Sequence, residues 1–404
     1  MKILMTTDLY IPTVNGVVTS IRTLKQSLEK KGHDVRILSL SEELKINSKD
    51  HIYSVSSMNF NKIYPGARVS LSVNRLIYQN IIEWQPDIIH SHCEFSTFKM
   101  AKDIAEDLNI PIVHTYHTIY EDYTHYFSPN KTIGEKIVSH FSRRILNQTE
   151  LVIAPTEKVK HLLNKYQVDT LIDVIPTGID TDQFQQEVNK EELLQLKQKL
   201  GILEQDRVLL FIGRIAKEKN IEELIRYLSN MKAPHIKLLI CGDGPFREEL
   251  EEYINEHHLS EQVIFTGMIC PKDIATYYQL GDIFINASTS ETQGLTYIEA
   301  LLSGLPVLCR KDASIDNVIY NGVNGLVFTN YEEFSNELRL LLEHPKKRKA
   351  LGQAASLMAT QVYSAETFAN KIEAQYVNVL SVHRKRLNSY KTNHSIIHYL
   401  RSMV

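Results

Sequence analysis

Two glutamates, Glu291 and Glu299, have the residue type and spacing to hold a ligand that is rich in hydroxyl groups. Seven residues lie between them, and one of these, Gly294, indicates a turn. An apolar pattern of helical period begins at Leu295, so we expect Glu291 on a loop and Glu299 on the second turn of the helix that follows. Ionised carboxylates only accept hydrogen bonds, which suits the hydroxyl groups of a sugar. The alternative is a solvated helix with two surface glutamates.

The start of the same helix is a candidate anion site. The backbone N–H groups of Gly294, Leu295 and Thr296 have no partners inside a helix that begins there, and the positive end of the helix dipole favours negative charge. Two acceptors for sugar hydroxyls would then flank a phosphate site. This combination predicts a nucleotide-sugar ligand.

A second segment, residues 211–220, places two cations at the end of a strand. The apolar run Phe211–Ile212 ends in Gly213, and Arg214 and Lys219 follow in the loop before the next helix. Ligands of parallel α/β proteins bind at the carboxyl ends of strands. The planar fork of an arginine and the point charge of a lysine suit a diphosphate. Taken alone, both residues could be ordinary loop cations.

Two further candidates lie in the first half of the chain. Gly16 stands between a strand pattern and a helical pattern, where it could let an anionic ligand approach the backbone or could simply form a turn. His117 follows the apolar run Ile112–His114. A histidine at a strand end is more often a structural group, and neighbours of the same type make it undiagnostic alone. These neighbours are His90, His92, His114 and His125.

The length and composition of the chain limit the classes of protein to which it can belong. At 404 residues the chain is long enough for two domains, and its net charge of −3, without a basic and aromatic stripe, argues against nucleic-acid binding. The four cysteines show no zinc-binding spacing. The N-terminus lacks the pattern of a signal peptide, and no apolar run approaches the roughly 18 residues of a transmembrane helix. We therefore expect a cytoplasmic protein.

Strand patterns alternate with helical patterns along the chain, which predicts an α/β protein with parallel sheets and crossover helices. A turn-rich stretch, 176–180, separates two similar halves and is the expected hinge. We predict domains at residues 1–176 and 177–364, followed by a helix and basic tail at 365–404. Strands are expected near residues 3–5, 35–38, 88–89, 112–114, 151–154, 173–175, 208–212, 237–241, 263–266, 283–286, 307–308 and 325–328.

A dinucleotide-binding oxidoreductase is another hypothesis for such a chain. The segment Gly242–Arg247 has the first two glycines of the Gly-x-Gly-x-x-Gly fingerprint, but Arg247 occupies the third position. A Gly-x4-Gly-Lys-Ser/Thr phosphate loop does not occur in the sequence either. The incomplete match disfavours this hypothesis.

Together these segments resemble the retaining, nucleotide-sugar-dependent glycosyltransferases of family 4, which have the GT-B fold. The specific parts are Gly-Arg-x5-Asn at 213–220, Glu-x7-Glu at 291–299, Pro-Thr-Val-Asn-Gly-Val at 12–17 and His-Thr-Tyr-His-Thr at 114–118. The resemblance covers most of the chain. It implies two Rossmann-like domains facing across a cleft, with a final helix that crosses back to the N-terminal, acceptor-binding domain.

The resemblance also implies roles for individual residues. His117 would contact the reacting donor sugar, and Glu291 would bind the hydroxyl groups of that sugar, as the catalytic pair. The rest of the donor would be bound by Gly16, Arg214, Lys219, Gly294, Leu295, Thr296 and Glu299. The implied reaction retains the α configuration, and the leaving phosphate takes the proton of the acceptor. No cluster of histidines and carboxylates indicates a divalent metal, so we expect no cofactor.

On the acceptor side, the candidates are Glu94 and Tyr123. The phrases at 121–126 and 290–295 look like those of the bacterial diacylglycerol glucosyltransferases. The segment 131–145 is amphipathic and cationic, which fits an anionic membrane surface or, alternatively, an ordinary half-buried helix. The expected membrane contacts are Lys131, Lys136, Arg143 and Arg144.

These observations predict a hexosyltransferase that acts on diacylglycerol or a monoglycosyl-diacylglycerol at the cytoplasmic face of the cell membrane. UDP-glucose is the favoured donor, and UDP-galactose stays open because the two sugars differ at a single hydroxyl. A cell-wall or capsular polysaccharide transferase of the same fold is one alternative. An inactive GT-B partner of an active glycosyltransferase is another, and the complete set of expected donor residues argues against it.

Overall fold

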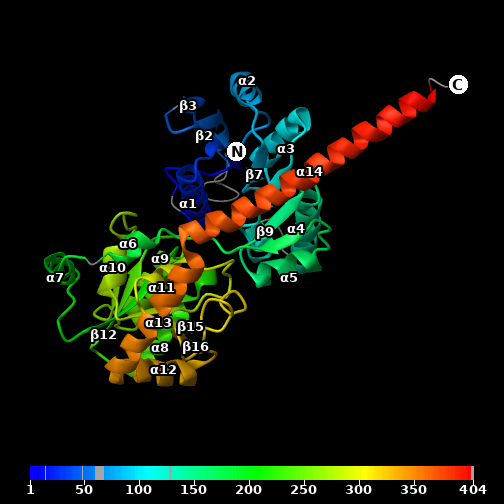
Figure 1. Cartoon of the computed structure of the whole chain (residues 1–404). Coiled ribbons are helices and arrows are strands. Elements are labelled where there is room, and N and C mark those ends of the chain that lie inside the picture. Colours follow the sequence, from blue (N-terminus) through cyan, green and yellow to red (C-terminus); the bar gives the residue numbers. More distant parts are fainter. Residues whose placement is uncertain (14, 48, 60–67, 127–129, 187, 402–404) are drawn as a thin grey trace. The chain divides into compact units, whose positions relative to one another are not determined.

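The computed structural model describes residues 1–13, 15–47, 49–59, 68–126, 130–186 and 188–401 (Figure 1). The chain divides into two compact units. Unit 1 combines residues 1–178 with the segment from Ala365 onward, and unit 2 is Ile179–Ser364. The sequence places the boundaries after residues 176 and 364, so the first structural boundary falls inside the expected hinge.

Unit 1 is built on an eight-stranded sheet with the order β10-β9-β8-β7-β1-β2-β4-β3. Its strands are parallel, except that β3 pairs antiparallel with β4 at one edge. The strands are β1 (Lys2–Thr7), β2 (Asp34–Ser41), β3 (Lys45–Asn47), β4 (Ile52–Ser56), β7 (Ile88–Ser91), β8 (Ile112–Thr115), β9 (Leu151–Ala154) and β10 (Ile172–Val174). A separate two-stranded ribbon is formed by β5 (Met58–Asn59) and β6 (Arg68–Val69).

The helices of unit 1 cover both faces of this sheet (Figure 1). They are α1 (Gly16–Lys30), α2 (Arg75–Trp84), α3 (Ser96–Leu108), the 3-10 helix η1 (Tyr120–Tyr126), α4 (Lys131–Leu146), α5 (Glu157–Lys165) and α14 (Ala365–Arg401). Within the described part of the chain, no helix is long and apolar enough to cross a membrane.

The side chains of β1 point alternately into the two main cores of unit 1, one on each face of the sheet. Ile3 and Met5 pack with α1 and α14, whereas Leu4 packs on the opposite face with α2 and α3. The final helix α14 enters the first of these cores through Ile372 and Tyr376. Because the central strands are parallel and covered on both faces, the loops after β1, β7 and β8 leave the same edge of the sheet.

Unit 2 contains a six-stranded parallel sheet with the order β13-β12-β11-β14-β15-β16. The strands are β11 (Arg207–Ile212), β12 (Ile236–Cys241), β13 (Val263–Gly267), β14 (Ile283–Asn286), β15 (Val307–Arg310) and β16 (Gly325–Phe328). The helices are α6 (Thr181–Gln185), α7 (Lys190–Lys199), the 3-10 helix η2 (Lys217–Lys219), α8 (Ile221–Met231), α9 (Arg247–Glu256), α10 (Ile274–Leu280), α11 (Leu295–Leu302), α12 (Tyr331–Glu343) and α13 (Pro345–Tyr363).

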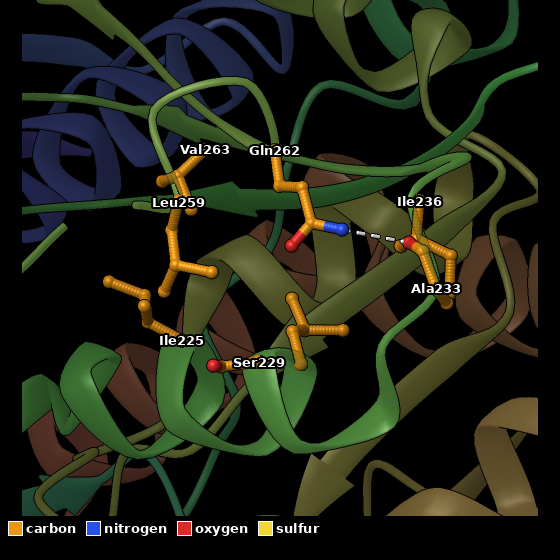
Figure 2. Close-up of a pocket in the computed structure, with 8 residues that line it drawn as sticks. Ile225, Ser229, Ala233, Ile236, Leu259, Gln262 and Val263 are labelled. Atoms are coloured by element: carbon orange, nitrogen blue, oxygen red, sulfur yellow. Dashed lines mark hydrogen bonds between the residues drawn. The ribbon is translucent and has the colours of Figure 1, made fainter. Parts of the chain in front are cut away.

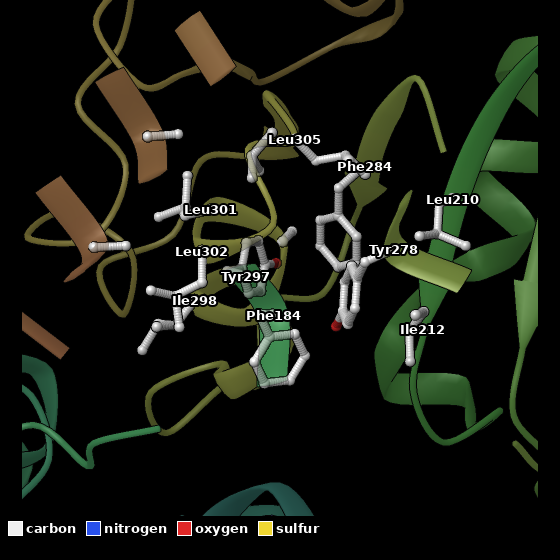
Figure 3. Packing of buried hydrophobic residues seen from close by; sticks show 14 of the residues in the cluster. Phe184, Leu210, Ile212, Tyr278, Phe284, Tyr297, Ile298, Leu301, Leu302 and Leu305 are labelled. Atoms are coloured by element: carbon white, nitrogen blue, oxygen red, sulfur yellow. The ribbon is translucent and has the colours of Figure 1, made fainter. Parts of the chain in front are cut away.

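Alternate residues of β11 face the two cores of unit 2. Leu210 and Ile212 pack in the core drawn in Figure 3, which also holds the fully buried ring of Tyr297. Leu209 and Phe211 pack in the core on the other face of the sheet. Tyr297 therefore anchors the first turn of α11 to the sheet, where its ring packs edge-on against Phe284 of β14.

Candidate functional site

The loops that follow β11 and β12 pack backbone against backbone. A Cβ atom on Gly242 would lie 2.0 Å from the carbonyl oxygen of Gly213, and one on Gly244 would lie 2.2 Å from that of Ile215. Only glycine fits these contacts. The two glycines of the incomplete dinucleotide fingerprint thus hold the loop that carries Arg214 against the neighbouring strand end.

Both expected diphosphate cations lie next to carboxylates. The Lys219 ammonium is 2.6 Å from Glu291 Oε1, and both side chains are largely buried. The Arg214 guanidinium pairs with Glu218, which the sequence analysis did not single out although its i, i+4 spacing is a signal. The structure therefore brings Lys219 and Glu291, 72 positions apart in the sequence, to one point at the strand ends.

Gly294 precedes helix α11 in a conformation that other residues rarely adopt. Its φ is +71°, and a Cβ atom there would lie 2.5 Å from Cδ2 of Tyr297. As the N-cap residue, Gly294 brings no side chain to cap the helix. The amides of Leu295 and Thr296 form the first turn of α11, where the sequence analysis predicts an anion site.

Glu299 lies on the inner side of α11 with 8 % of its surface exposed. The Tyr278 hydroxyl, from α10, donates a hydrogen bond to Glu299 Oε2 at 2.7 Å. Burial raises the pKa of this carboxyl to about 7, and the bond from Tyr278 opposes the rise. Tyr278 was not predicted, because nothing in the sequence marks which tyrosine reaches a given carboxylate.

In unit 1, the start of α1 has its own cap. The side chain of Asn15 accepts a hydrogen bond from the Val18 amide at 2.9 Å. Gly16 is the first residue of this helix. The expected donor-binding residue Gly16 thus lies at a helix start where the Asn15 side chain already accepts a hydrogen bond from one of the backbone amides of the first turn.

His117 stands just past β8 with a half-buried ring. Its Nε2 lies 2.9 Å from Nδ1 of His92, which follows β7. Burial, with a smaller effect of the nearby His114, lowers the pKa of His117 to about 3. The ring is therefore neutral at physiological pH, with one nitrogen that donates a hydrogen bond and one that accepts.

Glu94, one of the two expected acceptor-side residues, is 3 % exposed. The Tyr120 hydroxyl donates to one carboxylate oxygen, and His114 Nε2 lies 3.2 Å from the other. These contacts make Glu94 a support for the loops around it. The other expected residue, Tyr123, has its backbone in η1, and its side chain lies outside the described residues.

Helix α4 has a buried face and an exposed face. Val138 and Leu146 pack inward, whereas Ile133 and Ile137 are 55 % and 52 % exposed. All four expected membrane cations are exposed on this helix: Lys131, Lys136, Arg143 and Arg144. The exposed face combines isoleucines with cations, as the membrane hypothesis expects, and the buried face is equally what the alternative of a half-buried helix expects.

A small cavity in unit 2, drawn in Figure 2, lies away from the carboxyl ends of β11 and β12. It measures about 10 Å³, which is room for about one water molecule. Its lining includes Ile236 and Val263, the first residues of β12 and β13, so the cavity lies at the amino ends of the strands. Ala233, whose carbonyl oxygen accepts from the Gln262 amide at 2.9 Å, also lines it. This is a gap in the packing rather than part of the candidate site.

The chain matches two protein families. Glycosyltransferase Family 4 matches residues 14–183, and Glycosyl transferases group 1 matches residues 194–358. The α-monoglucosyldiacylglycerol synthase of Streptococcus pneumoniae is 36 % identical over 393 residues, which cover 94 % of this chain and 86 % of that protein. The protein of the same name from Acholeplasma laidlawii is 32 % identical over 400 residues, which cover 96 % of this chain and 100 % of that protein.

Solved structures resemble the whole fold. HepE of Anabaena, in complex with UDP and glucose, has a TM-score of 0.74 at 18 % identity, covering 94 % of this chain and 100 % of its own. WaaG, a glycosyltransferase involved in lipopolysaccharide biosynthesis, has a TM-score of 0.69 at 17 % identity, covering 92 % and 99 %. At these identities the likeness is one of fold.

Proposed function

Because the chain belongs to the GT-B glycosyltransferases, with a family 4 domain followed by a group 1 domain, we propose that it moves glucose from UDP-glucose to diacylglycerol or a monoglycosyl-diacylglycerol. The acceptor class comes from two α-monoglucosyldiacylglycerol synthases, 36 % and 32 % identical to it over nearly its whole length. The structural observation that carries the proposal is the Lys219–Glu291 contact, because it joins a diphosphate cation to an acceptor for sugar hydroxyls.

Unit 2 would bind the donor. Arg214, Lys219 and the first amides of α11 neutralise the leaving diphosphate, whose negative charge grows as the glycosidic bond breaks. Glu299 accepts hydrogen bonds from the ribose hydroxyls. Phosphate oxygens then compete with Glu291 for the Lys219 ammonium, which leaves the Glu291 carboxylate available for the hydroxyls of the sugar.

Unit 1 would contribute His117 to the reacting sugar. The transition state of glycosyl transfer resembles an oxocarbenium ion, so a positive charge beside the anomeric carbon would raise its energy. The low pKa of His117 keeps its ring neutral, and the ring still offers one N–H donor. In a retaining reaction of this type, the leaving phosphate takes the acceptor proton, and His117 orients the sugar.

Transfer assays with labelled donors test the proposal directly. Radiolabelled UDP-glucose and UDP-galactose are each incubated with vesicles that carry diacylglycerol, with vesicles that carry monoglucosyl-diacylglycerol, and with a soluble oligosaccharide. We expect label from UDP-glucose in a lipid product that α-glucosidase cleaves.

Two other results would contradict the proposal. Label confined to the oligosaccharide would favour the polysaccharide transferase. Tight UDP binding without turnover on any acceptor would favour an inactive partner of another glycosyltransferase.

The acceptor class also predicts where the enzyme meets the membrane. On α4, Ile133 and Ile137 would enter the interface, and each of the four cations would add about 1 kcal/mol of attraction to an anionic surface. Phe95 extends this surface, because its ring stacks on Phe141 at a centroid distance of 5.4 Å. We propose that the enzyme is peripheral on the cytoplasmic face of the membrane through this surface.

Vesicle sedimentation measures the docking. Wild-type protein should sediment with anionic vesicles, less with neutral ones, and less as salt rises, because exposed charges are screened over about 10 Å at 0.1 M salt. Changing Lys131, Lys136, Arg143 and Arg144 to Gln should remove the preference for anionic lipid and leave UDP binding intact. The matched control changes four exposed lysines of unit 2 to Gln: Lys232, Lys346, Lys347 and Lys349. Equal losses in both variants would show a general charge effect and overturn the assignment to α4.

A further inference from the structure

The imidazole of His117 is held by a second, more deeply buried imidazole. His92 is 2 % exposed, and its Nδ1 lies 2.9 Å from Nε2 of His117. The two ring planes differ by only 26° and the ring centroids lie 5.2 Å apart, so the rings meet at their edges and the lone pair of one nitrogen lies close to the N–H direction of the other. Both rings have a lowered pKa because of burial, so this is a hydrogen bond between two neutral imidazoles.

Two tautomeric arrangements satisfy this bond, and they differ at the far side of His92. In one arrangement His117 donates from Nε2, and the proton of His92 then sits on Nε2. Within the described part of the chain, His92 Nε2 is buried and has no hydrogen-bond partner. A buried N–H without an acceptor is the less favourable outcome, since native proteins leave acceptors unpaired more readily than donors. The favoured arrangement therefore has His92 donating from Nδ1.

We propose that His92 is a positioning residue, which donates from Nδ1 to His117 Nε2 and thereby holds the proton of His117 on Nδ1. Nδ1 is then the donor that His117 offers to an oxygen of the sugar. The inference rests on the proposed function for the role of His117, whereas the tautomer itself is a property of the free protein. Loss of the N–H group of His92 would let His117 rotate or change tautomer. No group that contacts the nucleotide-sugar would be removed.

His92 is itself fixed from two directions. Its backbone amide donates to the Thr6 carbonyl oxygen at 2.8 Å, and its ring lies 4.1 Å from the ring of His90, between centroids. His90 in turn has Nδ1 2.6 Å from the Tyr376 hydroxyl of α14 and Nε2 2.7 Å from the Thr115 hydroxyl. The pair is thus supported by contacts from four elements, β1, β7, β8 and α14.

The titratable groups near the pair come from each element packed around it: Asp8, His90, Cys93, Glu94, His114, Tyr120 and Tyr376. His114 acts on the pKa of both His92 and His117, and His90 acts on that of His92, all in the lowering direction. The neighbouring imidazoles therefore add to burial in keeping the pair neutral.

Three substitutions at position 92 separate a positioning role from a merely structural one. His92→Asn keeps an N–H donor close to the position of Nδ1, His92→Leu removes the donor, and His92→Asp offers only acceptors. We expect kcat of the Asn variant within about threefold of wild type, and a kcat about 10- to 100-fold lower in the Leu variant with UDP affinity unchanged. In the Asp variant the new carboxylate should raise the pKa of His117, so kcat should be lost at neutral pH and partly recovered as pH rises.

Ring-nitrogen chemical shifts in protein labelled with ¹⁵N-histidine read the tautomer without any assay, with His117→Asn to assign the signal. Wild-type and His92→Asn protein should show His117 protonated on Nδ1, and His92→Leu should show a mixture. The matched control is His114→Leu, an equally buried histidine whose partner is Glu94, which should leave the His117 tautomer unchanged. Protonation of His117 on Nε2 in wild-type protein, or wild-type kcat in the Leu variant, overturns the inference. Absence of glucosyl transfer by wild-type protein overturns only the proposed function.

Discussion

At the scale of single residues, the two cations of unit 2 that we propose for the donor diphosphate are each paired with a carboxylate. Lys219 lies against Glu291, and Arg214 against Glu218. These pairs fix the direction of two long, flexible side chains in the free protein, before the proposed diphosphate would bind. In the proposed donor site, the carboxylates would also favour ligands that carry more negative charge than one carboxylate, because such a ligand must displace them from the cations.

Removing both cations should damage catalysis much more than folding. We expect the double variant Arg214→Ala/Lys219→Ala to lose about 2–4 kcal/mol of transition-state stabilisation in kcat/KM, because the leaving diphosphate is then under-neutralised. Steady-state kinetics with UDP-glucose measures this loss. Lys237→Ala is the matched control, since this cation stands in β12 near its amino end. Turnover near the wild-type value in the double variant would refute the assignment.

Glu299 should make donor binding depend on pH. Its pKa is raised to about 7 by burial, so the carboxyl is mostly neutral at pH 6 and mostly ionised at pH 8. The ionised form is the better acceptor for ribose hydroxyls, and a ligand that prefers it binds more tightly as pH rises. Calorimetry should show UDP affinity increasing by up to about tenfold over this range.

Glu299→Gln separates this effect from the ionisation of UDP itself, which both proteins share. The variant should bind UDP more weakly at pH 8, with less change in affinity between pH 6 and pH 8 than wild type. Parallel affinity profiles for the two proteins would mean that another group titrates.

At the scale of elements, the start of α11 depends on a glycine. Gly294→Ala would place a methyl group 2.5 Å from the ring of Tyr297 at a φ of +71°. We expect unfolding to become easier by about 1–3 kcal/mol, together with a loss of UDP affinity, because the first amides of α11 must shift. Thermal or urea unfolding and calorimetry measure the two effects.

Gly322→Ala is the matched control for Gly294→Ala. Gly322 has a similar φ of +78°, and a Cβ atom there would meet nothing within 4 Å. The Gly322→Ala variant therefore has the strain of an alanine at positive φ without a collision against another side chain. Equal destabilisation of the two variants, with UDP affinity intact in both, would show that Tyr297 does not control the start of α11.

At the scale of the whole molecule, the candidate residues are divided between the two units. His117 and Glu94 belong to unit 1, whereas Arg214, Lys219 and Glu291 belong to unit 2. The chain passes between the units twice, after residues 178 and 364. Because the net charge is only −3, the membrane attraction that we propose would have to come from a local surface such as α4 and not from the protein as a whole.

Catalysis should not require a divalent cation, because Arg214, Lys219 and a helix start are proposed to neutralise the diphosphate. In the described part of the chain, no three His, Cys, Asp or Glu side chains gather as a metal-binding group. The Asp-x-Asp spacing at Asp180–Asp182 forms the start of α6, where the Asp180 side chain accepts from the Asp182 amide. Dialysis against EDTA and assay without added metal should leave most of the activity. Complete loss, restored by Mg²⁺ or Mn²⁺, would contradict this prediction.

The local sequence pattern was enough to predict the strands that are buried on both faces. Continuous apolar runs such as Val208–Ile212 predict strands without knowledge of their neighbours, and each expected strand has a counterpart in the structure. The strands β3 to β6 were not predicted. They are short or half-exposed, so their residues carry only a weak pattern, and pairing with a neighbour decides whether a strand forms.

At the candidate site, too, some features follow from the local sequence and others only from the tertiary structure. The sequence by itself determined the residue types and their places at strand and helix ends, as for Arg214 after β11 and Gly294 before α11, because turns and helix starts are local. Only the tertiary structure decided which side chains meet: Lys219 with Glu291, Tyr278 with Glu299, and His92 with His117. These contacts depend on the order of strands in each sheet and on the face from which each helix packs. Residues far apart in the chain become neighbours only once the core has formed.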